Sequence, residues 1–339
     1  MRFSPKVIRR SLSVHTSVTG MCESKDSVAK HRFEPSLFQS PRNAQTRASI
    51  VVIFNPVAGR RRAALLWRVL DVLSANGIRL ELAETSRAGH AADLARGVAV
   101  SGTRIVVAAG GDGTIAEVAS GILGTGARLG VIPLGTANVL AHELELPLNP
   151  RAIAAALAFG RTRRILPGIA RCKNGTSRIF VQMLGLGFDA HVVHHLSVPL
   201  KHATGRGAYV LQGIRELVRY GFEPISLCVD GEMMTAASAI ISKGRLYGGC
   251  YRLTAEGRSA EPGFSVVTFH HSGAWAALMY GSALQLNLLP RAPGVRVRYG
   301  SHVEVLSNAH VPVQLDGDPA GYGPLSITDA DAPIDIITG

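Results

Sequence analysis

A β-branched run that ends in a glycine-rich turn constrains this chain more than any other feature. Ile105 to Val107 leads into Gly110-Gly111-Asp112-Gly113-Thr114, and a helix-like stretch follows. Glycines let backbone N–H groups approach a polyphosphate closely, and the positive end of the next helix points to the same place. A carboxylate among phosphates is useful when a metal ion or a hydroxyl proton is present. The segment therefore predicts a nucleoside triphosphate site for phosphoryl transfer, with a plain strand-to-helix turn as the alternative.

Strands and helices alternate around this turn. We expect strands at 49–54, 79–83, 104–108 and 129–133, and helices at 63–75, 91–100, 114–123 and 138–144. This alternation predicts an α/β domain with a parallel sheet and helices on both faces. Four polar turns follow strands and should meet at one edge of the sheet, where ligands bind; they are Asn55, Thr85, Gly110–Thr114 and Gly135–Asn138.

The pattern changes after residue 150. A helix is expected at 151–159 and further helices near 191–196 and 208–220. Strand-like runs are expected at 164–170, 178–184, 225–229, 236–242, 265–270, 295–299, 302–306 and 311–315. Short strands at this spacing indicate a C-terminal, mainly antiparallel β-sandwich domain with helices. We place the domains at 49–150 and 151–324, after an N-terminal tail at 1–48.

Charge is distributed unevenly. The net charge is +12, and residues 1–48 hold nine basic and three acidic residues, so half of the excess lies there. We predict a disordered basic tail, with a transit peptide or a start at Met21 as alternatives. The moderately basic body suits nucleotides and anionic membrane surfaces. It has no RNA-binding aromatic motif and no zinc-ligand spacing, so we expect no nucleic-acid partner.

The cysteines and the apolar runs suggest a location. Four scattered cysteines indicate a reducing compartment. We find no continuous apolar run long enough for a membrane span, and no secretory signal. The uncharged run 274–290 predicts a buried or interfacial helix, and we favour core packing over a lipid pocket. We therefore expect a cytoplasmic protein that associates peripherally with membranes.

Ordered motifs along the chain carry a family resemblance. They are Asn55-Pro56-x-x-Gly59, the Gly110–Thr114 turn with Glu117, Pro133-Leu-Gly-Thr-Ala-Asn138, Gly185-Leu-Gly-Phe-Asp-Ala190, Lys201 with Gly205 and Tyr209, and Gln314-Leu-Asp-Gly-Asp318. Over residues 49–338 the chain resembles the diacylglycerol kinase catalytic-domain family. It is most similar to the bacterial lipid-kinase branch, which is related to sphingosine and ceramide kinases.

The resemblance implies ATP- and Mg²⁺-dependent transfer of a phosphoryl group to a lipid hydroxyl at the bilayer surface. It implies an active site in a cleft between two domains, with a final strand near 325–338 that returns to the first domain. We leave a homodimer open. The implied nucleotide contacts are Asn55, Gly59, Thr85, Gly110, Gly111, Asp112, Gly113, Thr114, Ile115, Ala116, Glu117 and Thr136, and we add Asn138.

Three of these side chains have competing interpretations. Asp112 holds Mg²⁺ on the phosphates or orients the attacking hydroxyl, or it only caps a turn. Asn55 contacts the nucleotide or only forms an Asx turn. Asn138 is expected to cap its helix and to steady the nucleotide loop.

Two departures from the family pattern are visible. The family's general base is the acid in Asp-Gly-Glu, whereas this chain has Asp316-Gly317-Asp318, one methylene shorter. We assign the base to Asp318, with a hairpin of two solvated acids as the alternative. The family's structural Mg²⁺ loop carries an Asp-Gly pair where this chain has Glu261-Pro262-Gly263-Phe264, so Glu261 would have to substitute.

Histidines and arginines near residue 200 invite two further interpretations. His191 and His195 are four residues apart, which fits zinc on a helix, but no HExxH pattern or nearby cysteine supports it. Lys201, Arg206, Arg215 and Arg219 face a phosphate or an anionic membrane, or form a solvated face.

Three functions remain open from the sequence. A lipid kinase is the first. A soluble kinase similar to NAD kinases is the second, and it predicts a polar acceptor pocket. The third is a non-catalytic lipid- or nucleotide-binding relative, which the departures at Asp318 and Pro262 motivate.

Overall fold

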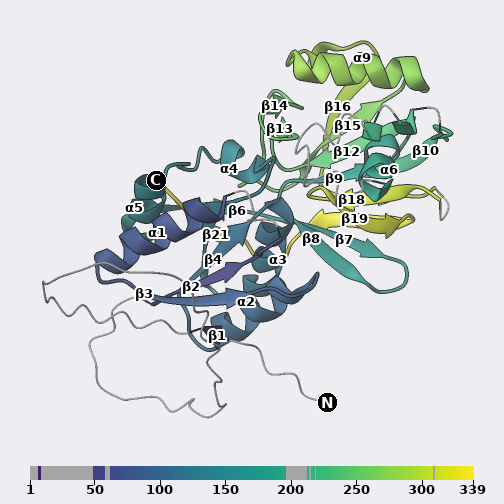
Figure 1. The fold of residues 1–339 in the computed structure, drawn as a ribbon. Helices are drawn as coiled ribbons and strands as arrows, with labels where there is room; N and C mark the ends of the chain where they lie inside the picture. The colour runs from purple at the N-terminus through teal and green to yellow at the C-terminus, as the bar shows by residue number, and fades with distance from the viewer. Residues whose placement is uncertain are drawn as a thin grey trace, which may run out of the picture.

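The computed structural model describes residues 7–8, 49–57, 62–195, 212–213, 215–217, 219–307 and 310–339. They form two domains that lie end to end (Figure 1). An α/β domain holds most of the N-terminal part of the chain, and a β-rich domain holds most of the rest. This arrangement confirms the predicted fold class.

Seven described strands form the sheet of the α/β domain, in the order β1-β3-β2-β4-β5-β21-β6. Their bounds are β1 Val7–Ile8, β2 Ser49–Phe54, β3 Arg79–Glu84, β4 Ile105–Gly110, β5 Arg128–Pro133, β6 Arg161–Ile165 and β21 Ile334–Thr338. The central strands β3, β2, β4, β5 and β21 are parallel, and β1 and β6 are antiparallel to their neighbours. β4 is fully buried, as a central parallel strand should be.

Helices cover both faces of this sheet. α1 (Ala63–Ala75) and α5 (Pro150–Phe159) pack on one face, and α2 (His90–Val100) and α3 (Asp112–Ile122) pack on the other. The short α4 (Val139–Glu143) follows β5. α1 buries Leu66, Val69, Leu70 and Leu73, which recur at helical spacing. Because the helices alternate with parallel strands, the turns after the strands lie at one edge of the sheet.

The boundary between the domains differs from the predicted one at residue 150. α5 packs with α1, and β6 pairs with β21, so residues 150–165 belong to the α/β domain. The run 164–170 is two strands in two sheets rather than one, because Pro167 has no N–H to continue a ladder. At the other end, only β21 returns to the first sheet, while residues 325–329 stay in the second domain.

The N-terminal tail contributes one short strand, β1, to the sheet of the α/β domain. Val7 and Ile8 pair with Ala83 and Leu82 at the edge of the sheet. The prediction of disorder throughout 1–48 is therefore wrong for these two residues, because a β-branched pair completes the open hydrogen bonds of an edge strand. The rest of the tail lies outside the described residues.

Two six-stranded antiparallel sheets form the second domain. One has the order β11-β10-β17-β20-β7-β8 and the other β16-β15-β12-β9-β18-β19. Their bounds are β7 Gly168–Cys172, β8 Ser177–Phe180, β9 Met183–Leu186, β10 Ile225–Val229, β11 Glu232–Ala236, β12 Ser238–Ser242, β15 Phe264–Phe269, β16 Val295–Gly300, β17 Val303–Val305, β18 Pro312–Leu315, β19 Asp318–Tyr322 and β20 Leu325–Asp329. Side chains of both sheets form one core between them, in which the rings of Phe180 and Phe264 lie 5.8 Å apart.

Further elements flank the outer face of the second sheet. They are α6 (Phe188–His195), the hairpin β13 (Leu246–Tyr247) and β14 (Tyr251–Arg252), α9 (Ala274–Gln285) and a 3₁₀ turn at Leu289–Arg291. α9 lies at the far end of the molecule (Figure 1). Within the described part of the chain, no helix combines the length and the hydropathy needed to cross a bilayer.

Candidate functional site

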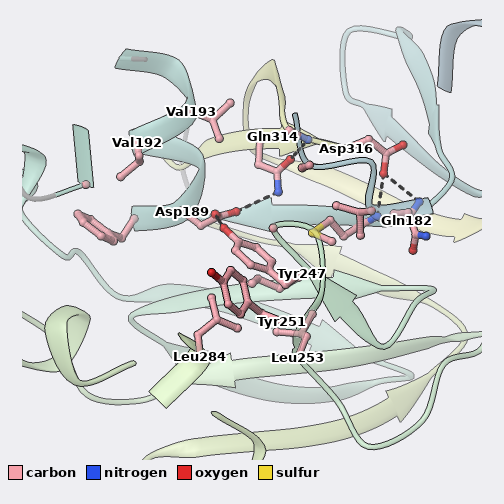
Figure 2. A pocket seen from close by; sticks show the side chains of 18 of the residues that line it. Gln182, Asp189, Val192, Val193, Tyr247, Tyr251, Leu253, Leu284, Gln314 and Asp316 are labelled. Carbon is pink, nitrogen blue, oxygen red and sulfur yellow. Dashed lines mark hydrogen bonds between the residues drawn. The ribbon is translucent and has the colours of Figure 1, made fainter. Parts of the chain in front are cut away.

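A cavity of about 520 Å³ extends from the edge of the parallel sheet into the second domain. Its polar end is lined by Asn55 after β2, by Gly111–Thr114 after β4 and by Gly135–Thr136 after β5. Its other end is lined by apolar side chains, which are Val139 of α4 and, from the second domain, Met183, Phe188, Val192, Val193, Phe222, Ile240, Leu253, Phe269, Leu284 and Leu289. Figure 2 shows Val192 and Val193 on α6 opposite Leu253 and Leu284. The cavity therefore has a polar end at the parallel sheet and an apolar end in the second domain.

The glycine-rich loop, Gly110–Thr114, packs directly against the loop after β5. A Cβ at Gly135 would lie 2.5 Å from the Cα of Gly111, so this approach needs glycine. A Cβ at Gly110 would likewise overlap Thr114. The amide of Asn55 donates to Thr114 Oγ1 at 3.2 Å, while its Oδ1 accepts from Val57 N in an Asx turn. Both interpretations of Asn55 therefore fit the same side chain.

Asp112 begins α3 and faces the cavity. Its Oδ1 accepts a hydrogen bond from Leu140 N at 3.3 Å, which ties the glycine-rich loop to α4. Burial raises the pKa of its carboxyl to about 6, against the lowering effect of the backbone N–H groups around it. A carboxylate that is held away from water in this way gains most from a nearby cation.

Asp316 is a second carboxyl at the polar end, and sequence reasoning gave it no role. Its two oxygens accept from the backbone N–H groups of Val181, Gln182 and Met183 at 2.7–2.9 Å (Figure 2). Burial raises its pKa to about 7, and the charge of Asp112 adds to the shift. Its φ of 49° lies in the left-handed region, which a short aspartate tolerates in a tight turn. The sequence signal for this buried carboxyl was the first acid of Asp316-Gly317-Asp318, which the turn places in the protein interior.

Asp318 reaches across the domain boundary to the glycine-rich loop. A Cβ placed on Gly113 would collide with its carboxylate, so the two lie in direct proximity. The structure thus brings Asp318 and Asp112 to one end of one cavity, from residues more than 200 positions apart. A hydroxyl placed between them would have a proton acceptor close to the glycines of the loop.

A third carboxyl lies midway along the cavity. Asp189 of α6 accepts from the hydroxyl of Tyr247 and from Gln314 Nε2, the latter at 2.9 Å (Figure 2). Burial raises its pKa, and the two hydrogen bonds oppose that shift. The residue belongs to the motif Gly185–Ala190, but sequence reasoning assigned it no contact. It supplies a polar point on a largely apolar wall.

Two buried amides at the site have side-chain atoms without a hydrogen-bond partner among the described residues. Asn138 Nδ2 donates to Gly135 O at 3.0 Å, and its Oδ1 has no hydrogen-bond partner among the described residues. The expected helix cap is wrong, because Asn138 has a left-handed backbone and makes no side-chain capping bond. Gln182 is 1% exposed, and neither its oxygen nor its nitrogen has a partner in the described structure.

Four predicted nucleotide contacts lie away from the cavity. Glu117 accepts from Gly89 N at 2.8 Å and from Ala91 N at 3.1 Å, so it satisfies the N-terminus of α2 instead. Ile115 is fully buried in the core and Ala116 packs against it, because α3 turns these side chains toward the sheet and α2. Thr85 follows β3, one strand farther from the loop than β2, and is not a lining residue.

The remaining residues that the sequence analysis singled out form two groups, those at the cavity and those outside the described part of the chain. Gly111, Asp112, Gly113, Thr114, Thr136 and Asn55 line the cavity, and Gly110 shapes the loop without lining it. Gly59, Lys201, Gly205, Arg206 and Tyr209 lie outside the described residues.

The implied structural Mg²⁺ loop does not fit this chain. Lys243 is fully buried, and its Nζ donates to Glu261 O at 2.8 Å, Gly263 O at 2.9 Å and Asp329 Oδ1 at 2.6 Å. The ammonium of Lys243 therefore already occupies oxygens of this loop that face inward. Burial lowers the pKa of Lys243 and the carboxylate of Asp329 raises it again. Glu261 instead pairs with Arg258 at 3.2 Å.

The donor set at the polar end does fit a divalent cation with a nucleotide. Mg²⁺ prefers oxygen ligands from one or two carboxylates together with phosphates. Asp112 supplies such a carboxylate, and burial raises the pKa of both Asp112 and Asp316, so their ionised forms gain from a nearby cation. Thr114 and the loop glycines leave room for phosphates beside them.

Comparisons with known proteins agree with this geometry. Residues 49–168 match the diacylglycerol kinase catalytic domain family model. A "Diacylglycerol kinase" of Mycobacterium tuberculosis is 30% identical over 205 residues, which are 59% of this chain and 66% of that protein. A "Diacylglycerol kinase" of Staphylococcus carnosus is 23% identical over 292 residues, 85% of this chain and 94% of that protein.

The chain spans 46–66% of the length of several curated relatives that it matches, the Mycobacterium tuberculosis protein among them. The fold is similar to the crystal structure of a diacylglycerol kinase from Bacillus anthracis, with a TM-score of 0.65 and 20% identity. That similarity covers 87% of this chain and 99% of the other.

Proposed function

This chain belongs to the diacylglycerol kinase catalytic-domain family, and we propose that it is an ATP-dependent kinase that phosphorylates a lipid hydroxyl. The acceptor is diacylglycerol or a ceramide- or sphingoid-type lipid. One observation carries the proposal: a single cavity joins the glycine-rich loop to a long apolar wall. A soluble polar acceptor would gain nothing from that wall, whereas an acyl chain gains about 0.8 kcal/mol for each buried CH₂ group.

The acids at the polar end suit phosphoryl transfer. The acceptor oxygen forms a bond to the γ-phosphorus while the bond to the ADP oxygen breaks, and the hydroxyl proton passes to the Asp318 carboxylate. Asp318 lies beside Gly113, so its proton acceptor is next to the loop that would hold the phosphates. Bound Mg²⁺ would neutralise charge that develops on the phosphoryl oxygens, and Asp112 would hold it.

An apolar surface near the cavity supports work at a bilayer. α9 lines the cavity with Ala277, Tyr280 and Leu284, but it also exposes Trp275 (86% exposed) and Leu278. Leu286 and Leu288 follow in the same exposed stretch. The expectation of core packing holds for one face of this run, since Ala276, Tyr280 and Leu289 belong to a buried cluster. A helix with one face packed inside and apolar side chains exposed on another suits insertion at a lipid surface.

The test is transfer from γ-labelled ATP to lipids in mixed micelles. We expect product with at least one of diacylglycerol, ceramide and a sphingoid base, and none with NAD. Asp318→Asn should lower kcat by about 10² to 10⁴ with little change in the KM for ATP. Asp318→Glu restores the family's side-chain length and should keep substantial activity. Asp335→Asn, an exposed acid on β21, is the matched control and should behave as wild type.

Other outcomes would decide against the proposal. Activity on NAD without any lipid acceptor would favour a soluble small-molecule kinase. ATP binding without turnover on any lipid would favour the non-catalytic alternative. If Asp318→Asn leaves kcat unchanged in an active enzyme, Asp112 or a water takes the proton instead.

A further inference from the structure

Three side chains of types that can ligate a metal ion meet beside α6. His191 and His195 lie four residues apart on this helix, and Glu216 approaches them from a later part of the chain. One ligand atom from each of the three lies within 4.8 Å of the others. His191 Nε2 and Glu216 Oε2 are 3.0 Å apart. Adjacent ligands of a tetrahedral zinc ion lie about 3.3 Å apart when the bonds are about 2.0–2.1 Å long.

We propose that His191, His195 and Glu216 form a zinc site that ties α6 to the chain around Glu216. Two imidazoles and one carboxylate are a recognised zinc ligand set, and they leave a fourth position for water. His195 is exposed, so that position opens to solvent. Imidazole ligands favour zinc over magnesium, so the site is chemically distinct from the acids at the cavity.

Neighbouring groups orient the three ligands. His195 Nδ1 bonds to His191 O at 2.9 Å, so Nε2 is the ring nitrogen of His195 that would bind a metal. Glu216 is 1% exposed, and its other oxygen accepts from Gln212 Nε2 at 2.7 Å. Such second partners fix the orientation of metal ligands in known sites. The ring of Tyr220, 4.8 Å from that of His191, covers one side.

Bound zinc would stabilise one wall of the cavity. Val192 and Val193 lie on the same helix as the two histidines but line the cavity, as Figure 2 shows. Gly213 and Phe222, on either side of Glu216 in the sequence, also line it. A metal that joins these two segments would therefore hold one apolar wall in place. The sequence supplied only the two histidines, because Glu216 is brought in by the fold.

The test uses the full chain, stripped of metal with EDTA and dialysed, without ATP or lipid. Zinc chloride is titrated against a chromophoric chelator. We expect one equivalent bound by wild type, and affinity at least about 100-fold weaker in His195→Ala, because even a change in an outer partner lowers metal affinity about 10- to 100-fold. Saturating zinc should raise the thermal midpoint of wild type but not of His195→Ala. His195 is exposed, so its loss leaves the core intact.

Two histidines serve as matched controls. His302 lies 3.2 Å from Glu304 on β17 without a third ligand among the described residues, and His194 on α6 bonds to Val313 O. His302→Ala and His194→Ala should bind zinc as wild type does. Equal affinity in wild type and His195→Ala, or an equal loss in His302→Ala, would overturn the site. Because no nucleotide or lipid is present, either result is independent of the proposed kinase activity.

Discussion

Asp112→Asn should inactivate the enzyme and yet stabilise the protein when no ligand is bound. Burial raises the pKa of this carboxyl from 3.8 to about 6. The folded protein therefore binds a proton more tightly than the unfolded chain does. The stabilisation of the folded state by protonated Asp112 is fully present below about pH 4 and is lost as the pH rises through about 6. An asparagine keeps the Oδ1 acceptor for Leu140 N and carries no charge.

The size of the effect follows from the shift. At about 1.36 kcal/mol for each pKa unit, the difference in pKa of Asp112 between the folded and unfolded states lowers the free energy of unfolding, relative to a neutral side chain, by about 3 kcal/mol at pH 8 and by about 1 kcal/mol at pH 4.5. Solvent reaches part of the side chain, so about 3 kcal/mol is an upper limit. Asp112 also repels Asp316, and the substitution removes that repulsion as well.

The assay is urea unfolding of ligand-free wild type and Asp112→Asn at both pH values. We expect the variant to be more stable, with a larger difference at the higher pH. Mg²⁺ with ATP should then stabilise wild type more than the variant, because a cation favours the ionised carboxylate. Turnover should fall by at least about 100-fold. Asp71→Asn on the exposed face of α1 is the control and should change neither property.

A variant that is no more stable than wild type, or a difference that does not vary with pH, would refute the assignment of a buried, uncompensated charge to Asp112. Turnover within about tenfold of wild type would refute its role at the phosphates, since catalytic charge contributions are usually larger.

Three further changes test other parts of the argument. Lys243→Met should lower the free energy of unfolding by about 3–5 kcal/mol, because it leaves the carboxylate of Asp329 without its cation. Lys173→Met is an exposed control in the same urea experiment. If millimolar Mg²⁺ restores the stability of Lys243→Met, this loop can bind a metal ion. Glu117→Gln should destabilise α2 by about 1–3 kcal/mol without changing the KM for ATP, and a higher KM at unchanged stability would return Glu117 to the nucleotide site. Gly113→Ala should displace Asp318 and lower kcat by about 100-fold, whereas Gly97→Ala, with open space at its Cβ, should keep full activity.

Local pattern was sufficient for most of the α/β domain. The strand at Ser49–Phe54 and the helix at Ala63–Ala75 have the predicted bounds, because apolar periodicity and a glycine stop are local signals. The glycine-rich loop was equally readable, since its spacing reflects backbone geometry. The domain boundary near Ile165 could not be predicted from the local sequence. Which sheet a strand joins depends on partners far away in the chain and not on the strand's own composition.

The sequence by itself determined the fold class, the edge of the sheet where the polar turns meet and the presence of acids at 112 and 318. Only the tertiary structure decided where each side chain points. Helix α3 turns Glu117 toward α2 rather than toward the loop, and Asp316 turns inward to three backbone N–H groups. Lys243 meets the carbonyl groups at 261 and 263 because two loops of the sandwich pack together. Such contacts join residues far apart in the chain, and local periodicity carries no information about them.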